Sequence, residues 1–258
     1  MTFRAIKILR EVDLIAAEDT RHTRKLLAHF EIHTPLTRFD ENCSIKVAEK
    51  LLERLQTGES VALVSDAGLP AISDPGIDLV RLAIDEKIKI SPIPGANAAL
   101  SALICSGLDT SKFLFAGFAP KTKKNRREFL QKLSGVDATI IFYEAPHRLK
   151  NFLTELAEIF GGRQAVLARE LTKIHEEFLR GEISELAEKI SEPRGEFVIV
   201  VEGKTFSEPL ETPDENISVV VEKFMANGLD KKSAMREAAK IFNVSRREIY
   251  NALIKEDT

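Results

Sequence analysis

The chain has 258 residues, 44% of them hydrophobic and 30% charged, and its net charge of −3 argues against a protein that coats nucleic acid by charge alone. Its two cysteines, Cys43 and Cys105, lie far apart, which disfavours a disulfide framework and a cysteine zinc site. No apolar run approaches the length of a membrane span and no signal peptide opens the chain, so we expect a cytosolic protein.

The first part of the chain alternates predicted helices and strands. The spacing of apolar residues, together with helix-ending glycines, predicts helices over residues 2–12, 44–58, 75–88 and 96–107. Short apolar runs predict strands over residues 13–19, 60–66 and 89–95. Repeated strand–loop–helix units of this kind are typical of a parallel sheet with crossover helices.

A second block of alternating elements begins near Phe113. Its predicted strands cover residues 112–118, 138–146, 164–172 and 195–203. Its predicted helices cover residues 124–135, 147–161 and 182–191. A polar, proline-containing stretch then leads to a small helical block. We therefore predict an α/β domain over 1–111, a second α/β domain over 112–204, a linker over 205–215 and a helical domain over 216–258.

Tight turns follow two of the predicted strands. Residues 66–68 (Asp-Ala-Gly) come directly after one strand, and residues 95–97 (Gly-Ala-Asn) come after another. Ligands of open α/β sheets bind outside the carboxyl ends of the strands, so the two turns predict a binding site at one sheet edge. The alternative is that the turns are purely structural, since these residue types dominate turns in general. The sequence contains neither G-x-x-x-x-G-K-[ST] nor G-x-G-x-x-G, which disfavours a nucleoside triphosphate or a dinucleotide.

Seven sequence blocks carry a resemblance to a known family. In chain order they are AEDTRHTRKLL, SDAGLPAISDPG, PGANAALSAL, FAGFAP, FYEAPHR, ARELTKIHEE and RGEFVIVVEG. Through these blocks, from about residue 3 to about residue 254, the chain resembles the ribosomal RNA small-subunit methyltransferase I family. These are cytidine 2′-O-methyltransferases among the tetrapyrrole-methylase-like enzymes of class III, which depend on S-adenosylmethionine.

The resemblance implies two α/β domains of the tetrapyrrole methylase type, with the cofactor S-adenosyl-L-methionine in the cleft between them and a helix-turn-helix-like domain at the C-terminus. It also implies a homodimer that methylates a cytidine ribose in small-subunit (16S) rRNA, either free or in the assembled small ribosomal subunit. Family members usually begin with a strand and a TPIGNL-type loop, whereas this chain begins with the helix that follows them. We therefore expect the first strand of the sheet to be missing.

The family pattern, carried onto this sequence, assigns the methyl-donor pocket to three segments. They are Asp66, Ala67 and Gly68; Pro94, Gly95, Ala96, Asn97 and Ala98; and Phe142 and Tyr143. The aromatic pair would pack against the donor from the second domain. The alternative for Phe142 is simple burial in the core, as is usual for aromatic residues in strands.

Methyl transfer to a ribose requires alignment of oxygen, methyl carbon and sulfur, and removal of a proton from a weakly acidic hydroxyl. It requires no metal and no covalent intermediate, and we see no ligand cluster with metal spacing. The catalytic candidates are Glu18, Asp19, Arg21 and Lys173. The same two motifs also offer His22, Arg169, Glu170, His175 and Glu176.

The candidates differ in what they can do. Glu18 and Asp19 come at a strand end, where they can activate the hydroxyl or bind ribose, and Arg21 can hold a phosphate. Lys173 can act as a base if desolvation lowers its pKa. The alternative for each of these residues is an ion pair that only holds its loop.

Two basic segments predict contact with RNA phosphates. The first, KTKKNRR, has no acidic residue and contains Lys121, Lys123, Lys124, Arg126 and Arg127. The second, residues 231–255, carries seven Lys/Arg against two Glu and resembles a helix-turn-helix, with Arg246 and Arg247 near the start of its second helix. The alternatives are a solvated charged face for the first segment and a packing or dimer-stabilising domain for the second.

Two other functions stay open on the sequence alone. One is methylation of a tetrapyrrole or another small molecule, and the other is RNA binding by a chain that is inactive because it lacks the first strand. The basic segments favour RNA over a small molecule, because an enzyme for a small molecule has little use for them.

Overall fold

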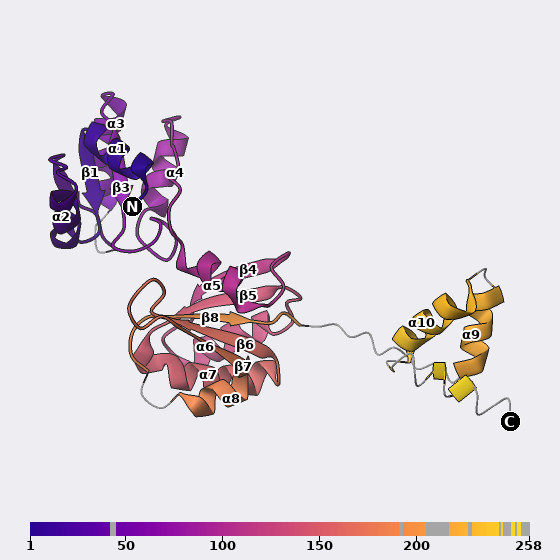
Figure 1. Cartoon of the computed structure of the whole chain (residues 1–258). Helices are drawn as coiled ribbons and strands as arrows, with labels where there is room; N and C mark the ends of the chain where they lie inside the picture. The colour runs from indigo at the N-terminus through magenta and orange to yellow at the C-terminus, as the bar shows by residue number, and fades with distance from the viewer. Residues whose placement is uncertain are drawn as a thin grey trace. The chain divides into compact units, whose positions relative to one another are not determined.

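The computed structural model describes residues 1–41, 45–190, 193–204, 217–226, 229–242, 244, 249–250 and 252–253. The chain divides into two compact units, residues 1–204 and residues 205–258 (Figure 1). Among the described residues, no helix is both long enough and apolar enough to cross a membrane. The first unit contains two separate β-sheets whose strands alternate with helices along the chain, so its fold is α/β.

The first sheet is parallel and has three strands in the order β2-β1-β3. They are β1 (Leu14–Ala17), β2 (Leu36–Arg38) and β3 (Val61–Val64). The predictions of β1 and β3 are confirmed, whereas β2 was not predicted. Because all three strands run in the same direction, the residues that follow them meet at one edge of the sheet.

Helices cover both faces of this sheet. They are α1 (Phe3–Glu11), α2 (Thr20–His29), α3 (Ile45–Gln56) and α4 (Ile77–Asp85). Ile15 of β1 is fully buried and packs with Leu9 of α1 and Leu27 of α2. The neighbouring residues Leu14 and Ala16 point the other way and join a cluster that includes residues of α3 and α4. The sheet is thus the middle layer of three.

The strand predicted over 89–95 is absent, and residues 88–97 have no regular secondary structure. Two prolines, Pro92 and Pro94, lie in this stretch and provide no backbone N–H. A strand needs those donors to pair with a neighbour, so the alternation of apolar residues here was misleading. The segment instead connects the first sheet to the helix that follows it.

The second sheet is mixed and has five strands in the order β4-β5-β8-β6-β7. They are β4 (Phe113–Phe118), β5 (Thr139–Glu144), β6 (Gln164–Arg169), β7 (Glu177–Glu182) and β8 (Phe197–Val201). Strands β4 and β5 are parallel, and β8 is antiparallel to both β5 and β6. The carboxyl ends of β4, β5 and β6 therefore lie at one edge. All but the edge strand β7 were predicted.

Helix α5 (Ala98–Ser106) lies on one face of the second sheet, and α6 (Lys123–Leu133), α7 (Pro146–Phe160) and α8 (Ile183–Lys189) lie on the other (Figure 1). Helix α5 therefore packs with the second sheet, although it precedes the predicted domain boundary at residue 111. That boundary and the other predicted domain limits stay predictions.

The second unit contains α9 (Ile217–Ala226) and α10 (Lys231–Ile241). Ala234 and Ala238 of α10 are fully buried with Ile249, as the predicted helix-turn-helix requires of these positions. Helix α9 contributes Val220 and Val221 to the same cluster; it lies within the predicted helical domain but outside the predicted helix-turn-helix. Most of the predicted turn and the start of the second helix, with Arg246 and Arg247, lie outside the described residues, as does the predicted linker.

Candidate active site

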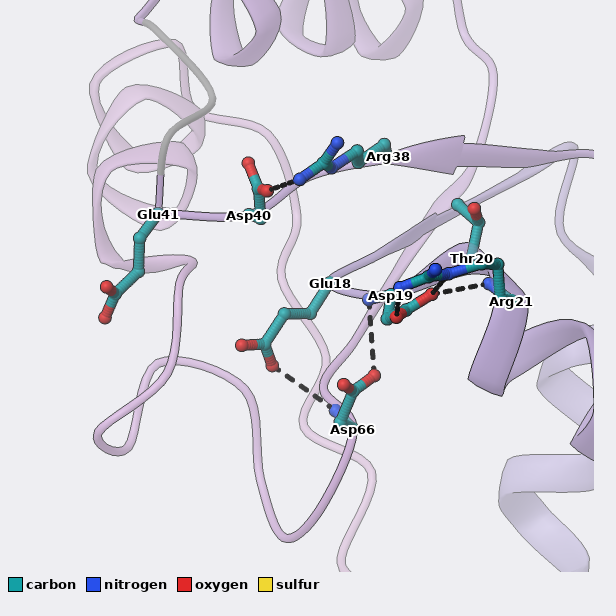
Figure 2. A pocket seen from close by; sticks show the side chains of 8 residues that line it. All are labelled: Glu18, Asp19, Thr20, Arg21, Arg38, Asp40, Glu41 and Asp66. Carbon is teal, nitrogen blue, oxygen red and sulfur yellow. Dashed lines mark hydrogen bonds and ion pairs between the residues drawn. The ribbon is translucent and has the colours of Figure 1, made fainter.

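A pocket of about 630 Å³ lies at the carboxyl edge of the first sheet. It is lined by Glu18, Asp19, Thr20, Arg21, Arg38, Asp40, Glu41 and Asp66 (Figure 2). The lining comes from the ends of all three parallel strands: 18–21 follows β1, 38–41 spans the end of β2, and Asp66 follows β3. This is the position at which α/β sheets bind ligands.

Short polar contacts join the ends of β1 and β3. The Asp19 backbone N–H donates to Oδ1 of Asp66 over 3.2 Å, and the Asp66 N–H lies 3.5 Å from Oε2 of Glu18 (Figure 2). These reciprocal contacts follow from the register, which places Ala17 beside Val64 in the adjacent strand. The parallel pairing therefore fixes three carboxylates next to one another.

Asp19 is held as the N-cap of α2. Its Oδ1 accepts from the Arg21 backbone N–H at 2.7 Å, and its two oxygens also bind the Arg21 guanidinium, with contacts of 3.1 and 2.7 Å. These hydrogen bonds hold the pKa of the Asp19 carboxyl well below its usual range. Asp19 is thus a weak proton acceptor and a strong structural anchor, and Arg21 is already paired with it.

Glu18 has the opposite environment. Burial raises the pKa of the Glu18 carboxyl, and the nearby charges of Asp74, Asp66 and Glu41 raise it further, against the lowering effect of the Asp66 N–H. A carboxylate with a raised pKa binds a proton more strongly than an ordinary glutamate does. Of the two acidic residues at the end of β1, Glu18 is therefore the better candidate for a general base.

The loop that carries Asp74 has an unusual backbone. Ala71 and Ser73 have φ angles of 65° and 62°, a left-handed region that non-glycine residues seldom adopt. Gly76 closes the loop at φ 142°, where an added Cβ would lie 2.6 Å from the Leu63 side chain. Burial also raises the pKa of the Asp74 carboxyl. Strained backbone of this kind is retained where the surrounding structure or the function requires it.

The two predicted turns lie beside each other. An added Cβ on Gly95 would lie 3.8 Å from the side chain of Leu69, so the loop after β3 contacts the segment that leads into α5. Asp66 lines the pocket, and Ala67 and Gly68 are exposed next to it. In the second turn Asn97 is the N-cap of α5, where its side chain accepts from the Leu100 N–H at 3.0 Å.

Pro94, Gly95, Ala96 and Ala98 are all exposed around that cap. None of these residues lines the pocket at the first sheet. Their assignment to the methyl donor stays a prediction.

The two aromatic candidates on β5 point to opposite faces of their sheet. Phe142 is fully buried and packs edge-to-face against Phe152 of α7, at 5.4 Å between ring centroids. The prediction that it lines a ligand pocket is wrong, because alternate residues of a strand face opposite ways and this one faces the helices α6 to α8. Tyr143 faces α5 instead, is only partly buried, and contacts the rings of Phe115 and Phe118.

Lys173 lies in a loop after β6 and is held by two carboxylates. Its Nζ is 3.0 Å from Oε1 of Glu170 and 3.0 Å from Oε2 of Glu196. Both hydrogen bonds raise the pKa of the Lys173 ammonium, which is the opposite of the lowering that a base would need. The arrangement matches the alternative reading of this residue, an ion pair that holds the loop.

Arginines and lysines of the KTKKNRR segment have different surroundings. Arg126 is buried and binds Glu155 of α7 through two hydrogen bonds of 2.8 Å, so the prediction that it contacts RNA is wrong. Arg127 also pairs with α7, at 2.5 Å from Glu158. Both acidic partners belong to α7, which is distant in sequence, so the sequence around the segment shows no acidic residue that pairs with its arginines.

The three lysines of the segment, Lys121, Lys123 and Lys124, are exposed.

Sequence reasoning missed part of the pocket. Arg38, Asp40 and Glu41 line it because β2 ends there, but three residues are too few for a recognisable strand pattern. Asp74 was visible within SDAGLPAISDPG as part of a turn, but nothing in the sequence indicated that its charge acts on Glu18.

One group in this region has donor atoms placed as metal ligands would be. Asp19, His22 and Asp66 bring these atoms within 4.8 Å of one another. Both oxygens of Asp19 already bind Arg21, however, so the arrangement suits an internal ion-pair network better than a cation site.

Solved structures of other proteins share this fold. A diphthine synthase structure matches with a TM-score of 0.58 at 16% identity, over 80% of this chain and 85% of that one. A uroporphyrin-III C-methyltransferase from Thermus thermophilus, complexed with S-adenyl homocysteine, matches with a TM-score of 0.52 at 16% identity, over 78% of this chain and 90% of that one. At such identities the likeness establishes the fold alone. This protein therefore has the tetrapyrrole methylase fold.

Sequence relatives define the family more narrowly. The model of the family described as Tetrapyrrole (Corrin/Porphyrin) Methylases matches residues 1–187. The ribosomal RNA small subunit methyltransferase I of Halalkalibacterium halodurans is 48% identical over 261 residues, covering 99% of this chain and 90% of the relative. The chain therefore belongs to the tetrapyrrole methylases and, within them, to the ribosomal RNA small subunit methyltransferase I family.

Proposed function

We propose that this protein transfers a methyl group from S-adenosylmethionine to the ribose 2′-oxygen of a cytidine in small-subunit rRNA. The observation that carries the proposal is the pair Glu18 and Asp66 at the carboxyl ends of adjacent parallel strands, with the pKa of Glu18 raised. The name of the 48%-identical relative supports small-subunit rRNA as the substrate. The family resemblance also supports a homodimer and a cytoplasmic location.

The chemistry of the pocket suits both reaction partners. S-adenosylmethionine supplies an electrophilic methyl group on a positively charged sulfonium. Acidic side chains, above all Asp66 and the nearby Asp74, favour such a cation and can accept hydrogen bonds from ribose hydroxyls. The same acidic lining disfavours a tetrapyrrole that carries several carboxylates, because like charges repel.

Each residue at the end of β1 has a separate task in this proposal. The Glu18 carboxylate accepts the proton of the ribose hydroxyl, because its pKa is the one that burial raises. Asp19 positions the site: it caps α2 and, through its backbone N–H, orients the Asp66 carboxylate. The phosphates of RNA must then be bound away from this acidic pocket, for which the exposed lysines after β4 are suited.

Incubation of the protein with a methyl-labelled donor and either 16S rRNA or small ribosomal subunits tests the proposal. We expect label in 2′-O-methylcytidine, recovered as a dinucleotide that resists alkali because the modified ribose lacks a free 2′-hydroxyl. Label on a nucleobase would contradict the ribose assignment. Label on an added tetrapyrrole, with none on RNA, would contradict the substrate class.

Replacement of Lys121, Lys123 and Lys124 by serine is expected to weaken RNA binding without changing donor affinity. Phosphate contacts carry no sequence information, so the loss should be similar for fragments of any sequence. The slope of log affinity against log salt should also flatten, by about 0.7 for each lost contact with a single strand. Arg127→Ser is the matched control, because Arg127 already pairs with Glu158. An unchanged salt slope in the triple variant would show that the lysines are only a solvated face.

A further inference from the structure

An exposed aromatic side chain ends strand β4. Phe118 is the last residue of β4, an outer strand of the second sheet, and its side chain is 53% exposed, which is a large exposed fraction for a phenylalanine. It lies opposite Tyr143 in the strand register, and their rings meet edge-to-face at 5.6 Å. Phe115 contacts the other side of this small group, at 5.0 Å from Tyr143. Phe118 is therefore the outermost ring of a supported aromatic group.

Three cations follow this ring within six residues. Lys121, Lys123 and Lys124 are exposed, and the structure places no carboxylate within ion-pair distance of them among the residues it describes. The next two basic residues, Arg126 and Arg127, are matched by acids of α7. Residues 118–124 thus present one aromatic face and three exposed lysines on the same short segment.

Two arginines, the buried Arg126 and the partly buried Arg148, bind the backbone of this segment. The Arg148 guanidinium donates to the carbonyl oxygens of Ala119 and Pro120, at 2.8 and 3.3 Å. Arg126 donates to the carbonyl of Lys121 at 3.1 Å. Three successive carbonyls are therefore bound inward.

The two arginines are themselves anchored. Arg148 lies 3.2 Å from Oε2 of Glu144, although that oxygen accepts no hydrogen bond of good geometry, and Arg126 is anchored by Glu155. The side chain of Glu144 is fully buried at the end of β5. Segment 118–124 is thus fixed before any ligand binds, which reduces the entropy lost on binding.

We propose that Phe118 stacks on an unpaired RNA base while Lys121, Lys123 and Lys124 contact the phosphates around that base. The inference rests on the proposed function and adds a second contact zone to it, at the carboxyl edge of the second sheet. Single-stranded RNA is the partner whose chemistry matches both features, because it offers a π face and negative charge at the spacing of one nucleotide. A second copy of the chain would cover the ring without using the cations.

Binding of single-stranded RNA oligonucleotides to the full-length chain, followed by fluorescence anisotropy, tests the proposal. Phe118→Ala should lower affinity by about 5- to 150-fold, the range found when a stacking aromatic is removed. Phe118→Trp should retain binding, because it preserves an aromatic face. Phe113→Ala is the matched control, since Phe113 is 45% exposed at the opposite end of the same strand and is not followed by lysines.

A cycle with abasic RNA separates stacking from other effects. If Phe118 stacks on a base, the loss caused by Phe118→Ala should disappear on an oligonucleotide whose bases are removed. The proposal is overturned if Phe118→Ala binds intact RNA as tightly as the wild type, or if it weakens abasic RNA equally. It is also overturned if the variant changes only donor affinity or only the oligomeric state, measured by calorimetry and light scattering.

The binding assay does not depend on methylation, so the two proposals fail separately. Stacking by a chain that places no methyl group on ribose would leave this inference standing and overturn the proposed function. If the wild type methylates ribose and Phe118→Ala binds RNA as tightly as the wild type, the proposed function stands and this inference is overturned.

Discussion

Glu18→Gln is expected to lower kcat/KM for ribose methylation by about 10²- to 10⁴-fold, the usual contribution of a general base. Glutamine keeps the size of the side chain and an oxygen that can accept from the Asp66 N–H, but it cannot take up a proton at neutral pH. Affinity for the methyl donor, measured by calorimetry, should change little. A variant with full activity would contradict the role of Glu18 as the base.

The pH dependence adds a second readout to this experiment. A base acts only when deprotonated, so log kcat/KM of the wild type should fall as the pH drops through the raised pKa of Glu18. The residual activity of Glu18→Gln should lack this acidic limb. Asp19→Asn is the matched control: the pKa of Asp19 is held low by Arg21, so this variant should keep the limb. If the acidic limb is lost in Asp19→Asn but kept in Glu18→Gln, the general base is Asp19 and not Glu18.

Arg126→Ala is expected to destabilise the protein by about 3–5 kcal/mol, the cost of removing one partner from a buried ion pair. Glu155 would keep its charge in a site where only 9% of its side chain is exposed, and the carbonyl of Lys121 would lose its donor. Denaturant unfolding, followed by far-UV circular dichroism, measures the loss. Glu155→Leu combined with Arg126→Met should recover most of it, because no unpaired charge remains.

Arg127→Ala is the control for this comparison. Its pair with Glu158 is more exposed, so we expect a cost of about 0.2–1 kcal/mol. Equal losses in Arg126→Ala and Arg127→Ala would show that burial does not distinguish the two pairs. It would also remove the argument that the buried Arg126 holds the loop after β4.

The sequence predicted elements well where apolar spacing and end signals agreed. Helix α5 illustrates this: Asn97 caps its start, and Gly107 ends it in the left-handed conformation. Two strands were missed. Strand β2 has three residues and so shows no period, and the edge strand β7, with the sequence EFLRGE, has neither a regular alternation nor a long apolar run. The opposite error, a strand over 89–95, came from apolar spacing read without regard to its two prolines.

The candidate site was predictable in so far as strand ends determine it. Glu18 and Asp66 were expected to be important because each comes at the end of a predicted strand, and parallel pairing of these strands brings the two residues together. The orientation of Phe142 could not be predicted, because the face of a strand that meets a ligand depends on which helices pack on which side. Arg126 shows the same limit, since its partner Glu155 is 29 residues away in sequence.

The separation of the hydrophobic clusters has a consequence for synthesis of the chain. The clusters around the first sheet draw only on residues 6–82, and those around the second sheet only on residues 99–201. Each core is completed by one continuous stretch of sequence, so neither has to wait for distant residues. Because chains fold domain by domain as they leave the ribosome, the first sheet can bury its apolar residues and assemble the acidic pocket while the second is still being translated. The irregular segment 88–97 separates the two cores in the sequence, and α5 is the first element of the second core.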